Sequence, residues 1–281
     1  MEDASRVPAQ LELIPPEVPR PPVTVASPGD DYQDPPYEVL VRLLGDIGVI
    51  GGKAALKPKQ TAVFAHIALH APVASEVVED AVWVAPTLTR RKRLANTVSE
   101  CRAALGATHL PISTDGRYRV GPEVKTDLDL FESRVAYAGT QDDEAAIETL
   151  RGALGLVEGP VFTYRNADRG SYVWVDLGNW HSTWEPKVSQ VAEDLAQRCL
   201  DLGDLDGAEW AALRGLNASA AHTGLTKLLM QTYLARGDAR AAEQVFESHQ
   251  TALEQLDLDE VDPDLVEFYR EACRSRKAEA S

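Results

Sequence analysis

The sequence contains few cysteines and no long apolar run. The three cysteines, Cys101, Cys199 and Cys273, lie far apart in a chain of 281 residues and show no paired spacing. They argue against a disulfide framework and a zinc cluster, and they favour a reducing, cytoplasmic location. No apolar stretch approaches the roughly 18 residues that a membrane helix requires, and residues 1–36 lack the basic and then apolar order of a signal peptide. We therefore predict a cytoplasmic protein that is not inserted in a membrane.

An overall excess of positive charge is also missing. The chain carries 28 basic and 44 acidic side chains, a formal net charge of −16, and this average argues against nucleic acid as a partner. The charge is unevenly distributed, however. Residues 37–126 contain 12 basic and 8 acidic side chains, a net charge of +4, whereas residues 127–281 contain 14 and 29, a net charge of −15. Only the segment 37–126 has the sign of charge that nucleic acid attracts.

Catalytic and metal-binding patterns are absent as well. No Ser/His/Asp or Cys/His set occurs in a supporting context, and the carboxylates are spread over predicted helix faces. His66 and His70 have an i, i+4 spacing that suits a metal, but no third ligand accompanies them, so we interpret them as ordinary surface or core histidines. We predict no enzyme activity, no cofactor and no metal site.

Residues 1–36 contain nine prolines, and two basic against seven acidic side chains. Proline fixes φ and removes a backbone donor, so such a stretch remains extended and solvated. We predict a disordered acidic tail or linker. Two interpretations remain open: a flexible terminus, or a linker to a domain upstream of Met1.

The segment 37–126 predicts a small antiparallel sheet followed by three helices and a hairpin. Short apolar pieces at residues 39–44, 47–50 and 54–56 are broken by glycines, as in short strands. Asp115-Gly116 is a strong hairpin signal between two arms within residues 109–120. The expected helices begin at Pro58, at Ser75 and at Thr87 or Thr89, and they end before Ala71, at Trp83 and at Leu105.

Residues 127–281 predict helices almost throughout, with an internal repeat. Five pairs of identical residues are separated by 34 positions, which is the period of tetratricopeptide helix pairs. A third copy around residues 139–146 is weaker and out of register. The pairs are Leu200 and Leu234, Gly203 and Gly237, Asp204 and Asp238, Ala208 and Ala242, and Glu209 and Glu243.

The third expected helix begins with four cations, Arg90, Arg91, Lys92 and Arg93. A helix N-terminus already carries partial positive charge, so cations there require compensation. A phosphate backbone would supply it. The alternative is compensation by acidic neighbours such as Glu76, Glu79 or Asp80.

The same helix has two distinct faces. A helical period places four apolar residues on one narrow arc, which we assign to the core, and small or polar residues on the opposite arc. On the outer arc Asn96 is suited to read adenine and Lys92 to read guanine in a major groove. Arg117 and Arg119 alternate with Tyr118 in the hairpin and share one side. The core arc is Leu94, Val98, Cys101 and Leu105, and the outer arc is Lys92, Ala95, Asn96, Ser99 and Ala103.

An aromatic segment interrupts the helical part at residues 161–184. Its tryptophans are Trp174, Trp180 and Trp184. We prefer core packing between helix pairs as their role, because Trp180 and Trp184 continue into a near-helical apolar pattern. The alternative is an exposed aromatic patch that binds a protein partner.

Several short runs occur in a specific order along residues 37–131. They are Val39 to Leu44, Lys57-Pro58-Lys59-Gln60, Ala81-Val82-Trp83, the run from Asn96 to Gly106, Asp115-Gly116-Arg117-Tyr118-Arg119-Val120, and Asp127-Leu128-Asp129-Leu130-Phe131. The first five resemble the winged helix-turn-helix of the SARP-type (antibiotic regulatory protein) activators of actinobacteria. The last run and the helical repeats resemble the bacterial transcriptional activator domain that accompanies it. The resemblance covers about residues 37–255.

The resemblance implies a mainly α fold with a small β component: an OmpR-like winged helix-turn-helix at residues 37–126, followed by an all-α tetratricopeptide-like array at residues 127–281. It implies a transcription regulator, an activator that reads double-stranded promoter DNA with helix 89–105 and wing 109–120. The helical domain of that family serves self-association, here as a homodimer, and contacts with RNA polymerase or another protein. The candidate DNA-binding residues are Arg90, Arg91, Lys92, Arg93, Asn96, Ser99, Arg102, Arg117 and Arg119.

Two features depart from the family pattern. The helical part is strongly acidic and follows a proline-rich lead-in, as in variants where this pair of domains ends a longer, membrane-linked protein. The aromatic segment 161–184 has no matching counterpart. A second hypothesis therefore stays open: a scaffold whose winged helix does not bind DNA, and which forms the C-terminal interaction module of a larger signalling or membrane-linked protein.

Overall fold

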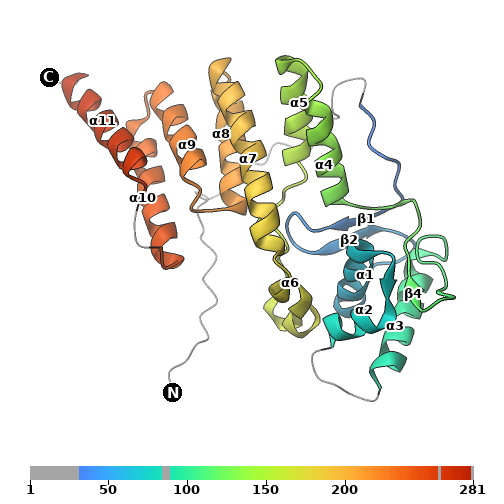
Figure 1. Cartoon of the computed structure of the whole chain (residues 1–281). Coiled ribbons are helices and arrows are strands. Elements are labelled where there is room, and N and C mark those ends of the chain that lie inside the picture. Colours follow the sequence, from blue (N-terminus) through green and yellow to red (C-terminus); the bar gives the residue numbers. More distant parts are fainter. Residues whose placement is uncertain (1–31, 84–88, 259–260, 280–281) are drawn as a thin grey trace, which may run out of the picture.

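The computed structural model describes residues 32–83, 89–258 and 261–279. Residues 1–31 of the predicted disordered tail lie outside the described residues, and so does the segment 84–88 between the second and third helices. Within the described part, no helix is both long and apolar enough to cross a membrane. The fold is mainly α, with a winged helix-turn-helix followed by a row of helix pairs (Figure 1).

The sheet of the winged helix is mixed rather than antiparallel. Strand β1 (Val39–Arg42) pairs with β2 (Gly48–Gly51) in the predicted antiparallel register, but its other edge pairs in parallel with β5 (Val124–Thr126). The prediction of a strand at residues 54–56 is wrong, because these residues lead into the next helix without a partner strand. The parallel edge brings the end of the winged helix back beside its beginning.

Three helices follow as predicted: α1 (Pro58–His70), α2 (Ser75–Val82) and α3 (Arg90–Leu105). The predicted apolar arc of α3 is buried to at least 98% at each of Leu94, Val98, Cys101 and Leu105. Gln60 of α1 fixes α3 in place, since its amide donates to Glu100 at 2.8 Å and its carbonyl lies 3.6 Å from the Cys101 thiol. Burial raises the pKa of that thiol to about 12, so Cys101 is a packing residue rather than a reactive one.

The predicted hairpin at residues 109–120 does not form. Strand β4 (Arg117–Tyr118) pairs instead with β3 (Val73–Ala74), and the Ser75 amide donates to the Gly116 carbonyl at 3.0 Å. The other arm stays out of the ladder because Arg102 binds its carbonyl oxygens and because Pro111 has no amide to donate. The wing is therefore a loop that is held to the beginning of α2.

The helical part begins without a linker. Thr126 ends β5 and caps α4 (Asp127–Ala138), accepting from the Asp129 amide at 3.1 Å. Helix α5 (Asp143–Leu154) pairs with α4, and a 3-10 helix, η1 (Asn166–Ser171), and α6 (Val173–Leu177) follow. Figure 1 shows the remaining helices in a row that leads away from α4 and α5. They are α7 (Trp180–Asp201), α8 (Leu205–Ala218), α9 (Thr223–Ala235), α10 (Ala239–Gln255) and α11 (Pro263–Glu279).

The 34-residue repeat has a structural basis. Gly203 and Gly237 occupy equivalent turns with φ of +76° and +78°, a region that favours glycine. The following aspartates cap α8 and α10: Asp204 accepts from Gly207 and Asp238 accepts from Ala241, each at 2.9 Å. Gly139, in the weaker third copy, has an ordinary φ of −64°. The α4 and α5 pair therefore lacks the left-handed turn of the two true repeats.

One continuous apolar core joins the winged helix to the array, from Val39 to Leu229. The loop after β1 is bonded to the segment after α5, with Phe162 donating to the Leu43 carbonyl at 2.7 Å and Glu158 to the Leu44 carbonyl at 2.8 Å. Asp127, at the start of α4, binds the same loop after β1, because its carboxylate accepts from the amides of Leu43 and Leu44 at 2.8 to 2.9 Å. The winged helix is thus fixed against the first helix pair.

The prediction that disorder extends to residue 36 is wrong at its C-terminal end. Tyr32 packs on Tyr137 with ring centroids 4.9 Å apart. Asp34 accepts a hydrogen bond at 3.0 Å from the guanidinium of Arg134, a residue of α4 that is only 3% exposed. A buried guanidinium requires a carboxylate partner, so these residues are part of the folded molecule.

Candidate nucleic-acid interface

Three cations lie exposed on the first turn of α3. Arg91, Lys92 and Arg93 project from the helix, and within residues 32–83, 89–258 and 261–279 they form no hydrogen bond or ion pair through their side chains. Figure 1 shows α3 at the edge of the winged helix, on the far side from α9, α10 and α11. This run has the exposure that an anionic partner requires.

Arg90, at the start of the same run, is directed inward. Its guanidinium donates to Asp80 at 2.9 Å and to the Trp83 carbonyl, and its side chain is only 15% exposed. Lys59 of α1 has a related position, with its ammonium 2.9 Å from the Val82 carbonyl and 4.5 Å from the centroid of the Trp83 ring. Both cations neutralise the negative C-terminal end of α2. Among the four cations predicted to contact DNA, Arg90 therefore has a structural role, and its charge is compensated by Asp80, as the alternative interpretation expected.

The beginning of α3 has a positive potential that its own residues do not offset. No acidic side chain lies in its first turn, and the Thr89 side chain does not cap it. Burial and then the nearby charge of Arg93 lower the pKa of Lys59. The helix dipole adds to the three exposed cations, and the sum favours an anion at this end.

The outer face of α3 matches the prediction. Asn96 and Ser99 are exposed and form no side-chain hydrogen bond with the described part of the chain. Ala95 and Ala103 are exposed on the same face, and their small side chains leave room for close approach. The face is slim, with hydrogen-bonding groups one turn beyond the cations, a shape suited to a major groove.

The arginines near the wing have different roles. Arg117 is exposed, and its side chain forms no hydrogen bond or ion pair with the described residues, while its backbone amide donates to Asp115 at 3.1 Å. Arg119 forms an ion pair with Asp115 at 2.8 Å, and the hydrogen bond from Arg119 is the main cause that lowers the pKa of that carboxyl. Arg102 donates to the carbonyls of Leu110 and Pro111 at 2.8 and 3.2 Å, so it supports the wing from within.

The tryptophans of the aromatic segment lie in the core, as preferred from the sequence. Trp174 and Trp184 are 5% and 6% exposed, and Trp180 is half-buried. Trp174 packs edge-on against His66, and Trp180 against His70, with centroids 5.3 and 5.5 Å apart. The alternative of an exposed aromatic patch for partner binding is therefore wrong for Trp174 and Trp184, and Trp180 offers only part of its ring.

The histidine pair of α1 is part of the same aromatic contact. His66 and His70 stack with centroids 4.3 Å apart, and burial lowers the pKa of His66 to about 4. Nδ1 of His70 lies 2.8 Å from the His66 carbonyl. A neutral, buried imidazole in an aromatic stack is a core residue, as the sequence indicated.

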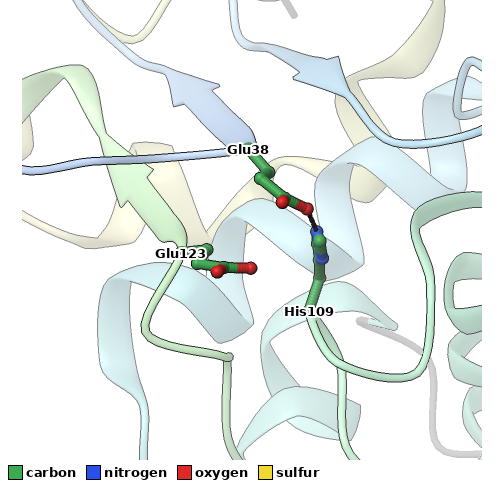
Figure 2. Close-up of side chains that lie close together, drawn as sticks. All are labelled: Glu38, His109 and Glu123. Carbon is green, nitrogen blue, oxygen red and sulfur yellow. Dashed lines mark ion pairs between the residues drawn. The ribbon is translucent and has the colours of Figure 1, made fainter.

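Sequence reasoning missed a second cluster of polar groups, at the base of the wing. Glu38, His109 and Glu123 lie far apart in the sequence, but the parallel pairing of β1 with β5 brings them together (Figure 2). His109 is buried, and its Nε2 lies 3.0 Å from the Glu38 carboxylate. No spacing pattern connects positions 38, 109 and 123, so the sequence contains no signal for this cluster.

No family model matches the chain, and no curated protein sequence matches it. Among solved structures, Mycobacterium tuberculosis EmbR in complex with a low-affinity phosphopeptide is similar, with a TM-score of 0.60 and 20% sequence identity. The match covers 85% of this chain, which spans 65% of the length of the EmbR chain. At this identity the likeness establishes a shared fold: a winged helix followed by a helical array.

Proposed function

We propose that this chain is a cytoplasmic transcription regulator that binds double-stranded DNA through its winged helix. In this proposal residues 37–126 contact DNA, and residues 127–281 mediate self-association or contacts with RNA polymerase. The observation that supports the proposal most strongly is the exposed run Arg91, Lys92 and Arg93 at the uncapped N-terminus of α3. The shared fold with a winged-helix protein agrees with it.

The side chains divide into two groups by their expected contacts. Arg91, Lys92, Arg93 and Arg117 are expected to bind phosphates and position the protein on the duplex. Asn96 and Ser99, on the outer face of α3, are expected to contact base edges, with Lys92 able to reach guanine. Arg119 is expected to contribute less to phosphate binding, because its ion pair with Asp115 offsets its positive charge. Arg90 and Arg102 act by holding α3 and the wing in place.

The acidic array is expected to stay away from the duplex. With a net charge of −15, residues 127–281 are repelled by phosphates, and this repulsion directs the basic face of α3 toward DNA. It also leaves the surface of the array available to a second copy or to the transcription machinery. We propose that the protein is an activator on this basis, since a bound winged helix then presents the array to its partners.

A fluorescence-anisotropy titration against a random DNA duplex tests the proposal. The four phosphate contacts expected from Arg91, Lys92, Arg93 and Arg117 give a slope of log affinity on log salt of about −3.6, so binding weakens about 150-fold between roughly 50 and 200 mM salt. The triple variant Arg91→Glu, Lys92→Glu, Arg93→Glu is expected to lose binding. The matched control is Arg165→Glu, Arg240→Glu, Arg270→Glu, which makes the same change in net charge at exposed sites of the array.

The control separates a local interface from a general effect of charge. If the two triple variants bind DNA equally, the run on α3 is not the interface. Binding that is absent or insensitive to salt in the wild type favours the second hypothesis, in which the winged helix is a structural part of a protein-interaction scaffold.

A further inference from the structure

We infer that Glu38, His109 and Glu123 form a binding site for a divalent first-row transition-metal cation, with Zn²⁺ as the test ion. One imidazole nitrogen and two carboxylates converge at the base of the wing, and their ligand atoms all lie within 4.8 Å of one another (Figure 2). A mixed nitrogen and oxygen set of this kind suits Zn²⁺ or Mn²⁺ better than Mg²⁺ or Ca²⁺, which prefer oxygen alone.

The spacing of the ligand atoms fits a cation. In a tetrahedral zinc site, bonds of about 2.1 Å place neighbouring ligand atoms about 3.4 Å apart. Nε2 of His109 and Oε2 of Glu38 are 3.0 Å apart, close to that span. The carboxylate of Glu123 is exposed and points toward the other two groups in Figure 2, so a rotation of its side chain brings it into the same shell. The open side toward solvent leaves room for water as a further ligand.

The backbone fixes the positions from which the three side chains extend. The Glu38 amide donates to the Glu123 carbonyl at 2.9 Å, and the Gly121 amide donates to the His109 carbonyl at 3.0 Å. A side chain at Gly121 would place its Cβ 2.3 Å from the Thr108 carbonyl oxygen, so the two ends of the wing are in close contact. The cluster therefore depends on main-chain geometry and not on a chance encounter of long surface side chains.

The histidine is suited to act as a ligand. It is only 5% exposed, and its Nε2 faces the carboxylates. Nδ1 lies 3.3 Å from the Thr108 hydroxyl, and in the tautomer with a proton on Nδ1 this contact leaves the lone pair of Nε2 directed at the carboxylates. The two carboxylates repel each other across this small space. A proton on His109 offsets one negative charge, whereas a divalent cation offsets both.

A cation at this site would join three segments of the winged helix. His109 precedes the wing loop, Glu123 follows it, and Glu38 lies immediately before β1. Binding would tie both ends of the wing to the sheet, so the metal would act as a structural clamp on the wing. This role does not depend on whether the wing contacts DNA.

Isothermal titration of the metal-free full chain with ZnCl₂ tests the inference. We expect one saturable site, and the Glu123→Gln variant is expected to bind Zn²⁺ at least about tenfold more weakly, as is usual when a ligand or its support is lost. Glu123 is exposed, so this variant is expected to fold, and circular dichroism verifies it. MgCl₂ is expected to give no saturable binding. Residues 1–31 contain no histidine or cysteine that would provide a competing soft ligand.

A second His and Glu pair provides the matched control. His181 and Glu185 on α7 lie 3.1 Å apart, but His181 is exposed, Glu185 is partly exposed, and no third ligand joins them among the described residues. The double variant His181→Gln, Glu185→Gln is therefore expected to keep full Zn²⁺ affinity. Zn²⁺ is also expected to raise the melting temperature of the wild type and of this control, and not that of Glu123→Gln. Absence of saturable Zn²⁺ binding, or equal affinity in Glu123→Gln, overturns the inference and leaves His109 and Glu38 as an ion pair.

Discussion

Replacing Asp127 by alanine is expected to destabilise the whole protein, because this one carboxylate joins the winged helix to the array. Asp127 is 2% exposed at the first position of α4. Its Oδ2 accepts from the amides of both Leu43 and Leu44, and its Oδ1 accepts from that of Leu43. No other described group is bonded to these two amides, so the substitution leaves two buried donors without an acceptor.

The size of the effect follows from those two donors. Leaving a buried amide without an acceptor costs about 1 to 3 kcal/mol, so two amides correspond to about 4 kcal/mol of unfolding free energy. Asp127→Asn is expected to cost less than alanine. Its amide oxygen can replace Oδ2 and accept from both donors, while its NH₂ group then faces the Leu43 amide and opposes it.

Urea denaturation followed by circular dichroism measures both variants. The control is Glu144→Ala, which removes an exposed acid from the first turn of α5 and is expected to change stability by less than about 0.5 kcal/mol. If the free energy of unfolding of Asp127→Ala lies within about 0.5 kcal/mol of the wild-type value, the contact between the winged helix and the array does not depend on this carboxylate.

The pH dependence provides an independent test of the same residue. Burial raises the pKa of Asp127 to about 7 from an ordinary value of 3.8, although its hydrogen bonds from Leu44 and Leu43 oppose the shift. Between about pH 4 and pH 7 the unfolded chain releases this proton while the folded chain keeps it, so the wild type loses stability as the pH rises. The Asp127→Asn variant lacks this group, and its stability relative to the wild type is expected to increase across that range. A constant difference between the two proteins would contradict the raised pKa.

Three further predictions concern glycines of the array. Gly203→Ala and Gly237→Ala are each expected to lower the free energy of unfolding by about 1 kcal/mol. The two losses are expected to be similar, because both turns require a positive φ and have open space around them. Gly139→Ala is expected to be neutral or stabilising by up to about 1 kcal/mol, since Gly139 has an ordinary φ and a Cβ there meets nothing closer than 3.5 Å. Urea denaturation ranks the three, and unequal losses at the two repeat positions would refute their equivalence. Gly215→Val is expected to cost about 2 kcal/mol or more, because a Cβ there would lie 2.4 Å from Leu225 and 2.6 Å from Ala192, and a loss below about 0.5 kcal/mol would show that α7, α8 and α9 separate easily.

Local patterns predicted the helices because their signals lie within one segment. Pro58, Ser75 and Gly106 mark the limits of α1, α2 and α3 in the structure as they do in the sequence. The 34-residue repeat was visible for the same reason, since each unit repeats its own turn and cap. The two faces of α3 also followed from helical spacing alone.

Strand partners were harder to predict, because pairing depends on segments that are distant in the chain. Asp115-Gly116 correctly indicated a turn, but β4 pairs with β3 and not with the preceding arm. The choice is made by Arg102, which binds the carbonyls of that arm, and a sequence pattern does not show where a guanidinium will donate. The parallel pairing of β5 with β1 was missed in the same way.

The candidate interface shows the same division. The sequence identified the run of four cations on α3, but not which of them faces outward. Arg90 differs from Arg91 only in its position relative to Asp80 and the end of α2, and that is a tertiary contact. The cluster of Glu38, His109 and Glu123 was invisible, because it exists only once β5 lies beside β1.

The contact between Asp34 and Arg134 determines where this molecule can be cut. A boundary at Tyr37, where the proline content falls, would deprive a guanidinium inside α4 of its carboxylate and remove the ring that covers Tyr137. Excising the winged helix and array for separate study therefore requires a start at or before Tyr32. The folded unit of this molecule therefore begins upstream of the position at which the composition of the chain changes.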